Sequence, residues 1–146
     1  MRDISLRHQT KRNSLHITKE NPAQAIYMGL VWVEVVIRNP NTGRHATVKA
    51  PVDAGVILTV ISHKVADELR LPVIGRSLVQ TAKGVVELEA RFGFIEIMGG
   101  ETLAGILVSD EVNTVLIGIT VLEQLGLEVE VTGRLKKTKL LLLQHG

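Results

Sequence analysis

The chain has 146 residues, of which 45% are hydrophobic and none is cysteine, and its formal net charge is +2 at pH 7. This length is typical of one domain with a sizeable buried core, and the hydrophobic content argues against a disordered chain. The absence of cysteine excludes a disulfide scaffold, a cysteine nucleophile and a thiolate metal site.

The positive charge of the chain is concentrated near its start. The first 27 residues hold five basic and two acidic residues, so the remainder, with 12 basic and 13 acidic residues, is close to neutral. No apolar run here has the length of a secretory signal, and none in the chain has the length of a membrane span. We predict a flexible or non-native arm over residues 1–28 and one domain over residues 29–146.

The first part of this domain has the pattern of β-strands. Residues 30–38 are rich in Val and Ile, residues 39–43 are turn formers, and residues 45–52 alternate in part, which predicts a hairpin. Residues 56–62 are apolar on both faces, which predicts a fully covered strand. A short helix follows, with Ser62 as its N-cap and Pro72 as its stop.

The second part alternates strands with turns and contains a second helix. The predicted strands cover residues 73–81, 85–97, 101–109, 114–118, 127–131 and 134–143, with tight turns at residues 82–84 and 99–100. The second helix is predicted from Thr120, because Thr120 and Glu123 have the spacing of a capping box. Gly126 stands where that helix would end.

One carboxylate, Asp53, interrupts the apolar stretch over residues 50–62. A charge in such surroundings costs on the order of several kcal/mol unless it is paired, hydrogen-bonded or protonated. Asp53 is therefore either a turn residue, as an Asp before Gly often is, or a residue that does chemistry.

Few other reactive patterns accompany Asp53. The five histidines (His8, His16, His45, His63 and His145) lack metal-ligand spacing, and we find neither a phosphate-binding loop nor a serine or lysine nucleophile motif. Hydrolysis of an amide needs an acid and a base together. Two carboxylates that share one proton supply both, and a symmetric homodimer would provide two copies of Asp53.

The domain resembles the retropepsin-like aspartic proteases, which are single-lobe and dimeric. The stretches that carry the likeness are PVDAGVILTVIS at residues 51–62, HKVADELRLP at 63–72, TAKGVVEL at 81–88 and TVLIGITVLEQLGLEVEVTGRL at 114–135. Each stretch is weakly specific alone, but their order and spacing together are characteristic of this family.

The resemblance implies a mostly β fold: a closed antiparallel β-barrel with one or two short helices, acting as a homodimer. It also implies a peptide or protein substrate and no cofactor or metal. The site residues it implies are catalytic Asp53; Ala54, Gly55 and Val56 in the active-site loop; Ala82, Lys83 and Gly84 in the flap over the substrate; and Leu116, Ile117 and Gly118 in support.

The sequence departs from the family pattern beside Asp53. The family has Thr or Ser where this chain has Ala54, and that hydroxyl bonds across the dimer axis; each lost bond costs about 0.5–1.5 kcal/mol. Val56 is bulkier than the usual alanine. Ile57 and Ile119 replace an Asp–Arg pair of viral members, which we interpret as the exchange of a salt bridge for an apolar contact.

Three interpretations of function follow from these residues. The first is an aspartic endopeptidase in which Asp53 of each chain activates water. The second is a catalytically weakened or inactive dimeric peptide-binding scaffold, favoured by Ala54. The third is a small β-barrel interaction protein in which Asp53 is only a turn residue. We expect a cytoplasmic protein without nucleic-acid or membrane partners, because the domain is near neutral and has few aromatic residues.

Overall fold

The computed structural model describes residues 31–130 and 132–138, so the predicted arm over residues 1–28 and the apolar run over residues 140–143 lie outside it. The strands are β1 (Val31–Arg38), β2 (His45–Val52), β3 (Thr59–Ile61), β4 (Val73–Thr81), β5 (Gly84–Ile97), β6 (Gly100–Val108), β7 (Val115–Leu116), β8 (Leu127–Val129) and β9 (Leu135–Lys137). The helices are α3 (His63–Glu68) and α4 (Ile119–Leu125).

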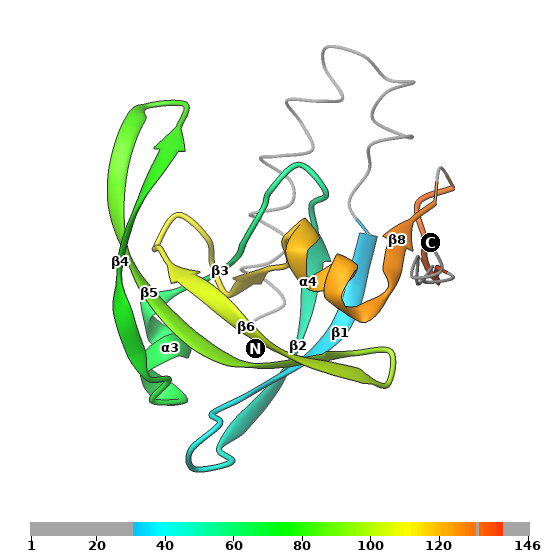
Figure 1. The fold of residues 1–146 in the computed structure, drawn as a ribbon, viewed down its shortest axis with the longest axis horizontal. Coiled ribbons are helices and arrows are strands. Elements are labelled where there is room, and N and C mark those ends of the chain that lie inside the picture. Colours follow the sequence, from blue (N-terminus) through cyan, green and yellow to red (C-terminus); the bar gives the residue numbers. More distant parts are fainter. Residues whose placement is uncertain (1–30, 131, 139–146) are drawn as a thin grey trace, which may run out of the picture.

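Seven of these strands form one sheet in the order β2-β1-β5-β6-β3-β7, with β4 paired to β5. All of its ladders are antiparallel except that between β3 and β6, in which Thr59 lies opposite Ile106. The 14-residue β5 is long enough to pair with β4 over its first part and with β1 over its last. Figure 1 shows the β4–β5 hairpin extending beyond the rest of the sheet. Strands β8 and β9 form a separate two-stranded sheet.

The predicted closed barrel is not found in the part of the chain that the structure describes. The outer strands of the sheet, β2 and β7, approach each other only at a single parallel bridge between Val52 and Ile117. A longer ladder does not form because β7 has two residues and the chain leaves the sheet at Gly118 to enter α4. The sheet is therefore curved and nearly closed, but open along this seam.

The core lies on the face of the sheet that is covered by the two helices. Every second residue is buried from Val35 onward in β1 and from Arg91 onward in β5. The fully buried side chains include Val35, Ile37, Ile61, Ile95, Ile97, Ile106, Val108, Val115, Ile117, Val121 and Leu122. Each such aliphatic side chain contributes about 1.5–3 kcal/mol on burial, which makes this cluster the main stabilising element.

Several predicted local structures are confirmed. Ser62 is the N-cap of α3, where its Oγ accepts a hydrogen bond from the Val65 N–H at 3.3 Å. The turn over residues 39–43 joins β1 to β2, and the turn at residues 82–84 joins β4 to β5. Gly126 ends α4 in the left-handed conformation with φ of 70°.

The strand predicted over residues 56–62 is shorter than expected. Only Thr59–Ile61 joins the sheet, because the preceding residues turn toward α4 instead. The first two backbone N–H groups of α4 donate to the carbonyl oxygens of Val56 and Ile57 at 2.7 and 3.0 Å. Ile57 is 70% exposed, so this part of the predicted strand is not covered as expected.

The predicted capping box of the second helix is also wrong. Helix α4 begins after Gly118, which has no side chain to cap it, and no side-chain cap from Thr120 and Glu123 forms. The carbonyls of the preceding loop already accept from the first N–H groups of the helix. Two of the four N–H donors that a helix start leaves unpaired are thus satisfied without a side chain.

Candidate active site

The end of β2 meets the segment that follows β7 in a parallel bridge between Val52 and Ile117, which we call the crossing. Asp53 lies directly beside it. Its backbone N–H donates to the Ile117 carbonyl at 3.0 Å, and the Ile117 N–H donates to the Pro51 carbonyl at 2.9 Å. Ile117 is completely buried, so this crossing is fixed inside the molecule. Of the supporting residues named from the sequence, Ile117 and Gly118 contact the Asp53 loop, and Leu116 pairs with Val60 in β3.

The carboxyl group of Asp53 sits at the surface end of this crossing and is half-buried. Its Oδ1 accepts a hydrogen bond from the Gly55 N–H at 2.9 Å, and its backbone carbonyl accepts from the Val56 N–H at 3.1 Å. Such an Asx turn is also expected of a structural Asp. Asp53 differs from an ordinary turn residue in the buried bridge between Val52 and Ile117 that lies beneath its loop.

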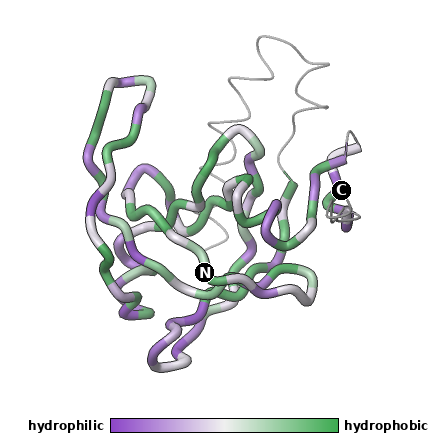
Figure 2. The backbone as a smooth tube through the Cα atoms, in the orientation of Figure 1, coloured by the Kyte–Doolittle hydropathy of each residue, from purple (hydrophilic) through white to green (hydrophobic). Residues whose placement is uncertain are grey.

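The loop that carries Asp53 is apolar but open to solvent. Ala54 and Gly55 are exposed, Val56 is half-buried, and Ile57 is 70% exposed. Figure 2 shows this segment, between β2 and β3, as mainly hydrophobic. Exposed apolar side chains gathered in one loop are typical of a surface that another molecule covers.

Gly118 and Thr59 hold the loop from below. The Gly118 N–H donates to the buried Thr59 Oγ1 at 3.0 Å. A Cβ atom at position 118 would lie 2.6 Å from the carbonyl carbon of Leu58 and 2.8 Å from the carbonyl oxygen of Ile57. Glycine is therefore required here because two backbone segments meet without room for a side chain.

The predicted flap residues lie at the tip of the β4–β5 hairpin. Thr81 closes the turn: its Oγ1 donates to the Gly84 carbonyl at 2.8 Å and accepts from the Lys83 N–H at 3.1 Å. Ala82 and Lys83 are exposed, and Gly84 has φ of 117°, which favours glycine. The tip stands apart from the Asp53 loop, although both lie toward the same end of the molecule (Figure 1).

The hairpin carries aliphatic side chains on both faces. Leu78 is 75% exposed and Val85 is 61% exposed, and both lie on the face that continues the core-facing side of β5. On the opposite face Val79 pairs with Val86. The hairpin therefore exposes aliphatic side chains to solvent within the described chain.

A second group of functional side chains was not identified from the sequence. At the base of the hairpin, Arg91 donates to Asp67 and Glu89, and His63 contacts Glu89 and Asp110. The hydrogen bond from the His63 backbone N–H, followed by that with its side chain, lowers the pKa of Asp110 below its ordinary value. The signal that could have found this group is the alternation of β5, which puts Arg91 on the buried face.

Metal ligation finds no support in the part of the chain described. No cluster of at least three His, Cys, Asp or Glu side chains suited to a metal ion occurs within residues 31–130 and 132–138. Within the same residues, neither helix has the length and apolar character needed to cross a membrane.

The architecture matches that of a solved retroviral enzyme. EIAV protease, in its complex with the inhibitor HBY-793, superposes with a TM-score of 0.54 at 18% identity, covering 77% of this chain and 93% of the viral one. The chain has a retropepsin-like fold. A solution structure of simian foamy virus (mac) protease aligns with a TM-score of 0.47 at 21% identity, over 64% of this chain and 93% of the viral one.

The structural match confirms the resemblance predicted from the sequence motifs, at the level of the fold. No protein-family model matches the chain, and no curated protein matches it significantly.

Proposed function

We propose that this chain is an aspartic endopeptidase that works as a homodimer, with Asp53 of each chain forming the catalytic pair. The observation that carries the proposal is the position of Asp53: a half-exposed carboxyl group on a loop anchored by a buried crossing. Electrostatic catalysis depends on groups held in place before the reaction, and this anchoring supplies that rigidity.

In the proposed dimer, one Asp53 is protonated and the other is ionised, because two carboxyl groups that are close together cannot both carry a charge. The ionised carboxylate takes a proton from water, which attacks the peptide carbonyl, while the protonated one donates to the developing oxyanion. The tetrahedral intermediate then collapses and its C–N bond breaks. The carboxyl group that took the proton from water gives it to the leaving amine, and a hydroxyl group of the intermediate returns a proton to the other carboxylate. No cofactor or metal enters this scheme.

The exposed loop supports the dimer. Ile57 places a 70% exposed aliphatic side chain four residues after Asp53, and a second copy would cover it. The apolar run over residues 140–143 is proposed to join the same interface. In the dimer, the hairpin tips at Ala82, Lys83 and Gly84 would cover a bound peptide. We propose a cytoplasmic location, because a chain without cysteine forms no disulfide bonds and so does not need an oxidising compartment.

A second candidate, a dimeric peptide-binding scaffold, is favoured by Ala54. This residue is exposed and has no hydroxyl group to bond across the dimer axis. In the scaffold, Asp53 would still lie at the centre but would not be held firmly enough for proton transfer. The two candidates differ in turnover and agree in assembly.

The test compares four forms of the chain: wild type, Asp53→Asn, Ala54→Thr and, as a control, Glu123→Gln, which removes an exposed acid from α4. We expect all to sediment as dimers at micromolar concentration. Wild type and the control should cleave a broad peptide library at mildly acidic pH, and Asp53→Asn should not. Ala54→Thr should tighten the dimer by about 1–3 kcal/mol if two hydroxyl bonds form.

Two results would decide against the peptidase. A monomeric wild-type chain would remove the shared site. Dimers without cleavage by either wild type or Ala54→Thr would leave the scaffold as the function, provided that peptides from the same library bind to the dimer.

A further inference from the structure

The β4–β5 hairpin leaves the body of the sheet at Glu89. The ladder between β5 and β6 begins with Glu89 opposite Val108, the last residue of β6. The ladder between β4 and β5 continues beyond this point as far as Thr81 opposite Gly84. Residues 77–88, which we name the free hairpin, are therefore held within the described chain by their own ladder and by what anchors Glu89.

Arg91 provides the fixed part of this anchor. Its side chain is 9% exposed, and its Nη1 donates to the Ala66 carbonyl at 3.0 Å. Its Nη2 donates to Asp67 Oδ1 at 2.8 Å and to Glu89 Oε1 at 3.3 Å. A guanidinium group keeps its charge at all ordinary pH values, so it joins α3 to the base of the hairpin without titrating.

His63 provides a second part of the anchor, and unlike a guanidinium group an imidazole can be neutral or charged. Its Nδ1 lies 3.1 Å from Asp110 Oδ2, in the loop after β6, and its Nε2 lies 3.6 Å from Glu89 Oε1. Its backbone N–H also donates to Asp110 Oδ1 at 3.1 Å. The imidazole thus stands between a carboxylate of the free hairpin's base and a carboxylate of the body.

The two protonation states of an imidazole differ in this position. A neutral ring has one N–H, so one of its two carboxylates faces a nitrogen lone pair, whereas an imidazolium donates to both. Charge-assisted bonds are the stronger ones. Around His63 and Arg91 stand the carboxylates of Glu89, Asp67 and Asp110, an excess of negative charge that a proton reduces.

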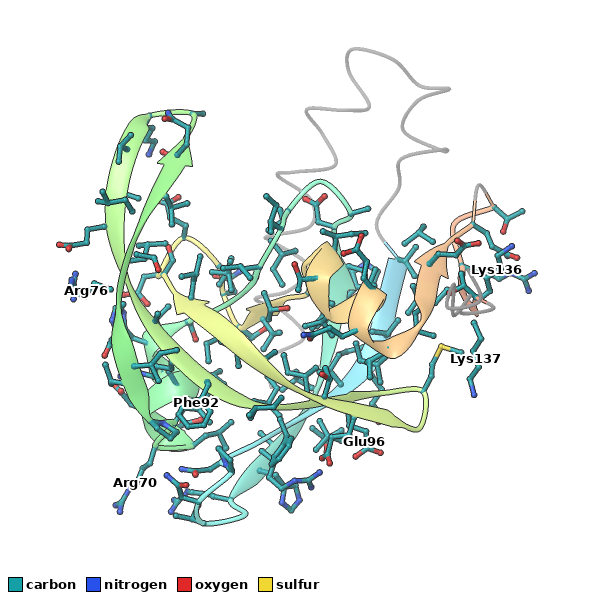
Figure 3. The ribbon with its side chains drawn as sticks, in the orientation of Figure 1. Arg70, Arg76, Phe92, Glu96, Lys136 and Lys137 are labelled. Atoms are coloured by element: carbon teal, nitrogen blue, oxygen red, sulfur yellow. The ribbon has the colours of Figure 1, made fainter. Side chains whose placement is uncertain are left out.

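Two further charged groups flank this cluster. Arg76 of β4 lies opposite Glu89 in the ladder, but its Nε pairs with Glu87 Oε1 at 3.2 Å, and Figure 3 shows it extending away from the rest of the chain. Glu111 follows Asp110 in the loop and adds another acid there. Neither takes the place of His63 between Glu89 and Asp110.

We propose that His63 is a positioning residue that ties the free hairpin more firmly to the body when its imidazole is protonated. The benefit for catalysis rests on the proposed function: the flap is held best in mild acid, where a pair of carboxyl groups sharing one proton is active. The link itself is a property of the fold and does not require activity.

The pH window follows from the charges at the anchor. The pKa of Asp110 is lowered in the folded chain, so its contribution is present above its unfolded pKa and is lost as pH falls through the lower folded value. As a class, imidazole side chains are charged in mild acid and neutral in mild base. We therefore expect the link through an imidazolium to be strongest in mild acid, where Asp110 is still ionised.

The test is amide hydrogen exchange of the free hairpin at about pH 5.5 and about pH 8, on either side of the imidazole range, corrected for intrinsic exchange rates. In wild type, we expect protection of residues 77–88 to be about two- to fivefold greater at the lower pH, the factor typical of a partly exposed ion pair. In His63→Gln, which keeps an N–H donor but cannot be charged, this difference should disappear, and in Asp110→Asn it should shrink.

His45→Gln is the matched control. His45 is exposed at the start of β2, and its Nδ1 lies 3.4 Å from the Gly43 carbonyl, within the β1–β2 turn. This variant should keep the wild-type pH difference in the free hairpin. A pH difference that survives in His63→Gln, or that wild type lacks, would overturn the inference.

A kinetic measurement separates this inference from the proposed function. If peptides are cleaved, His63→Gln should raise KM at about pH 5.5 by about two- to fivefold and leave kcat unchanged, because it alters how the cover is held and not the reacting groups. If wild type cleaves nothing, the proposed function fails, while the exchange experiment still decides whether His63 anchors the hairpin.

Discussion

The Asp53 loop and the free hairpin both expose aliphatic side chains, yet they are held in opposite ways. The Asp53 N–H of the loop donates to the Ile117 carbonyl after β7, and two carbonyl oxygens of the loop accept from the first N–H groups of α4. The free hairpin, residues 77–88, is bonded within the described chain mainly through its own ladder. The tertiary contacts of these two regions are therefore concentrated beneath the Asp53 carboxyl group, and the free hairpin has few of them.

Glycine shows the same contrast at single positions. At Gly118, beneath the loop, an added Cβ would overlap backbone atoms of Leu58. At Gly84, in the tip of the hairpin, an added Cβ would meet nothing within 4 Å, and the glycine serves its positive φ. Gly118 is required by the packing of distant segments, and Gly84 is required by the local backbone conformation of the turn.

The largest effect is expected from closing the space beneath the loop. Gly118→Ala puts a Cβ within 2.6 Å of a backbone atom that cannot move freely, and we expect a loss of about 3 kcal/mol or more in the free energy of unfolding. Gly105→Ala is the control, because the added Cβ would meet nothing within 4 Å. Urea unfolding should show the control within about 1 kcal/mol of wild type; equal losses would mean that the space at Gly118 is not special.

A smaller effect is expected from the hydroxyl group below the loop. Thr59→Val keeps the shape but removes the acceptor of the Gly118 N–H, which costs about 1–3 kcal/mol for a buried donor without a partner. Thr114→Val is the matched control, since Thr114 Oγ1 is buried and has no hydrogen-bond partner in the described chain. The control should be as stable as wild type or more so. The contrast between loop and hairpin would weaken if the two variants lost equal stability.

The smallest effect is expected in the free hairpin. Leu78→Ser changes a side chain that is 75% exposed, so the free energy of unfolding should stay within about 0.5 kcal/mol of wild type. Thermal and urea unfolding of the dilute protein measure this directly. A loss above 1 kcal/mol, on the scale of a buried contact, would show that the hairpin packs against something other than solvent.

The sequence was sufficient to predict features that depend on local patterns. Ser62 and Gly126 were identified as helix boundaries from their capping preferences, and the tight turn at residues 82–84 was identified between two strand patterns. Asp53 and Gly118 were identified through the resemblance, and the structure places both at the crossing beside Ile117.

The features that the sequence did not predict depend on partners distant along the chain. The predicted strand over residues 56–62 does not include Val56 and Ile57, because their carbonyl oxygens accept hydrogen bonds from the first N–H groups of α4. No residue near them in the sequence indicates this pairing. For the same reason the capping box at Thr120 was expected but is not formed. The open seam of the sheet depends on the chain leaving it at Gly118, which strand propensity does not encode.

The bond between Thr59 and Gly118 also bears on how the molecule is assembled. These residues are 59 positions apart, and both the β4–β5 hairpin and β6 lie between them in the chain. Local hairpins close within microseconds, whereas contacts over such separations are reached late and place the folding of β-rich domains in the range of about milliseconds to seconds. We therefore expect a folding chain to complete its hairpins first and to set Asp53 in position among its last steps. A newly made molecule would then acquire the arrangement needed for the proposed chemistry only after most of its framework is already built.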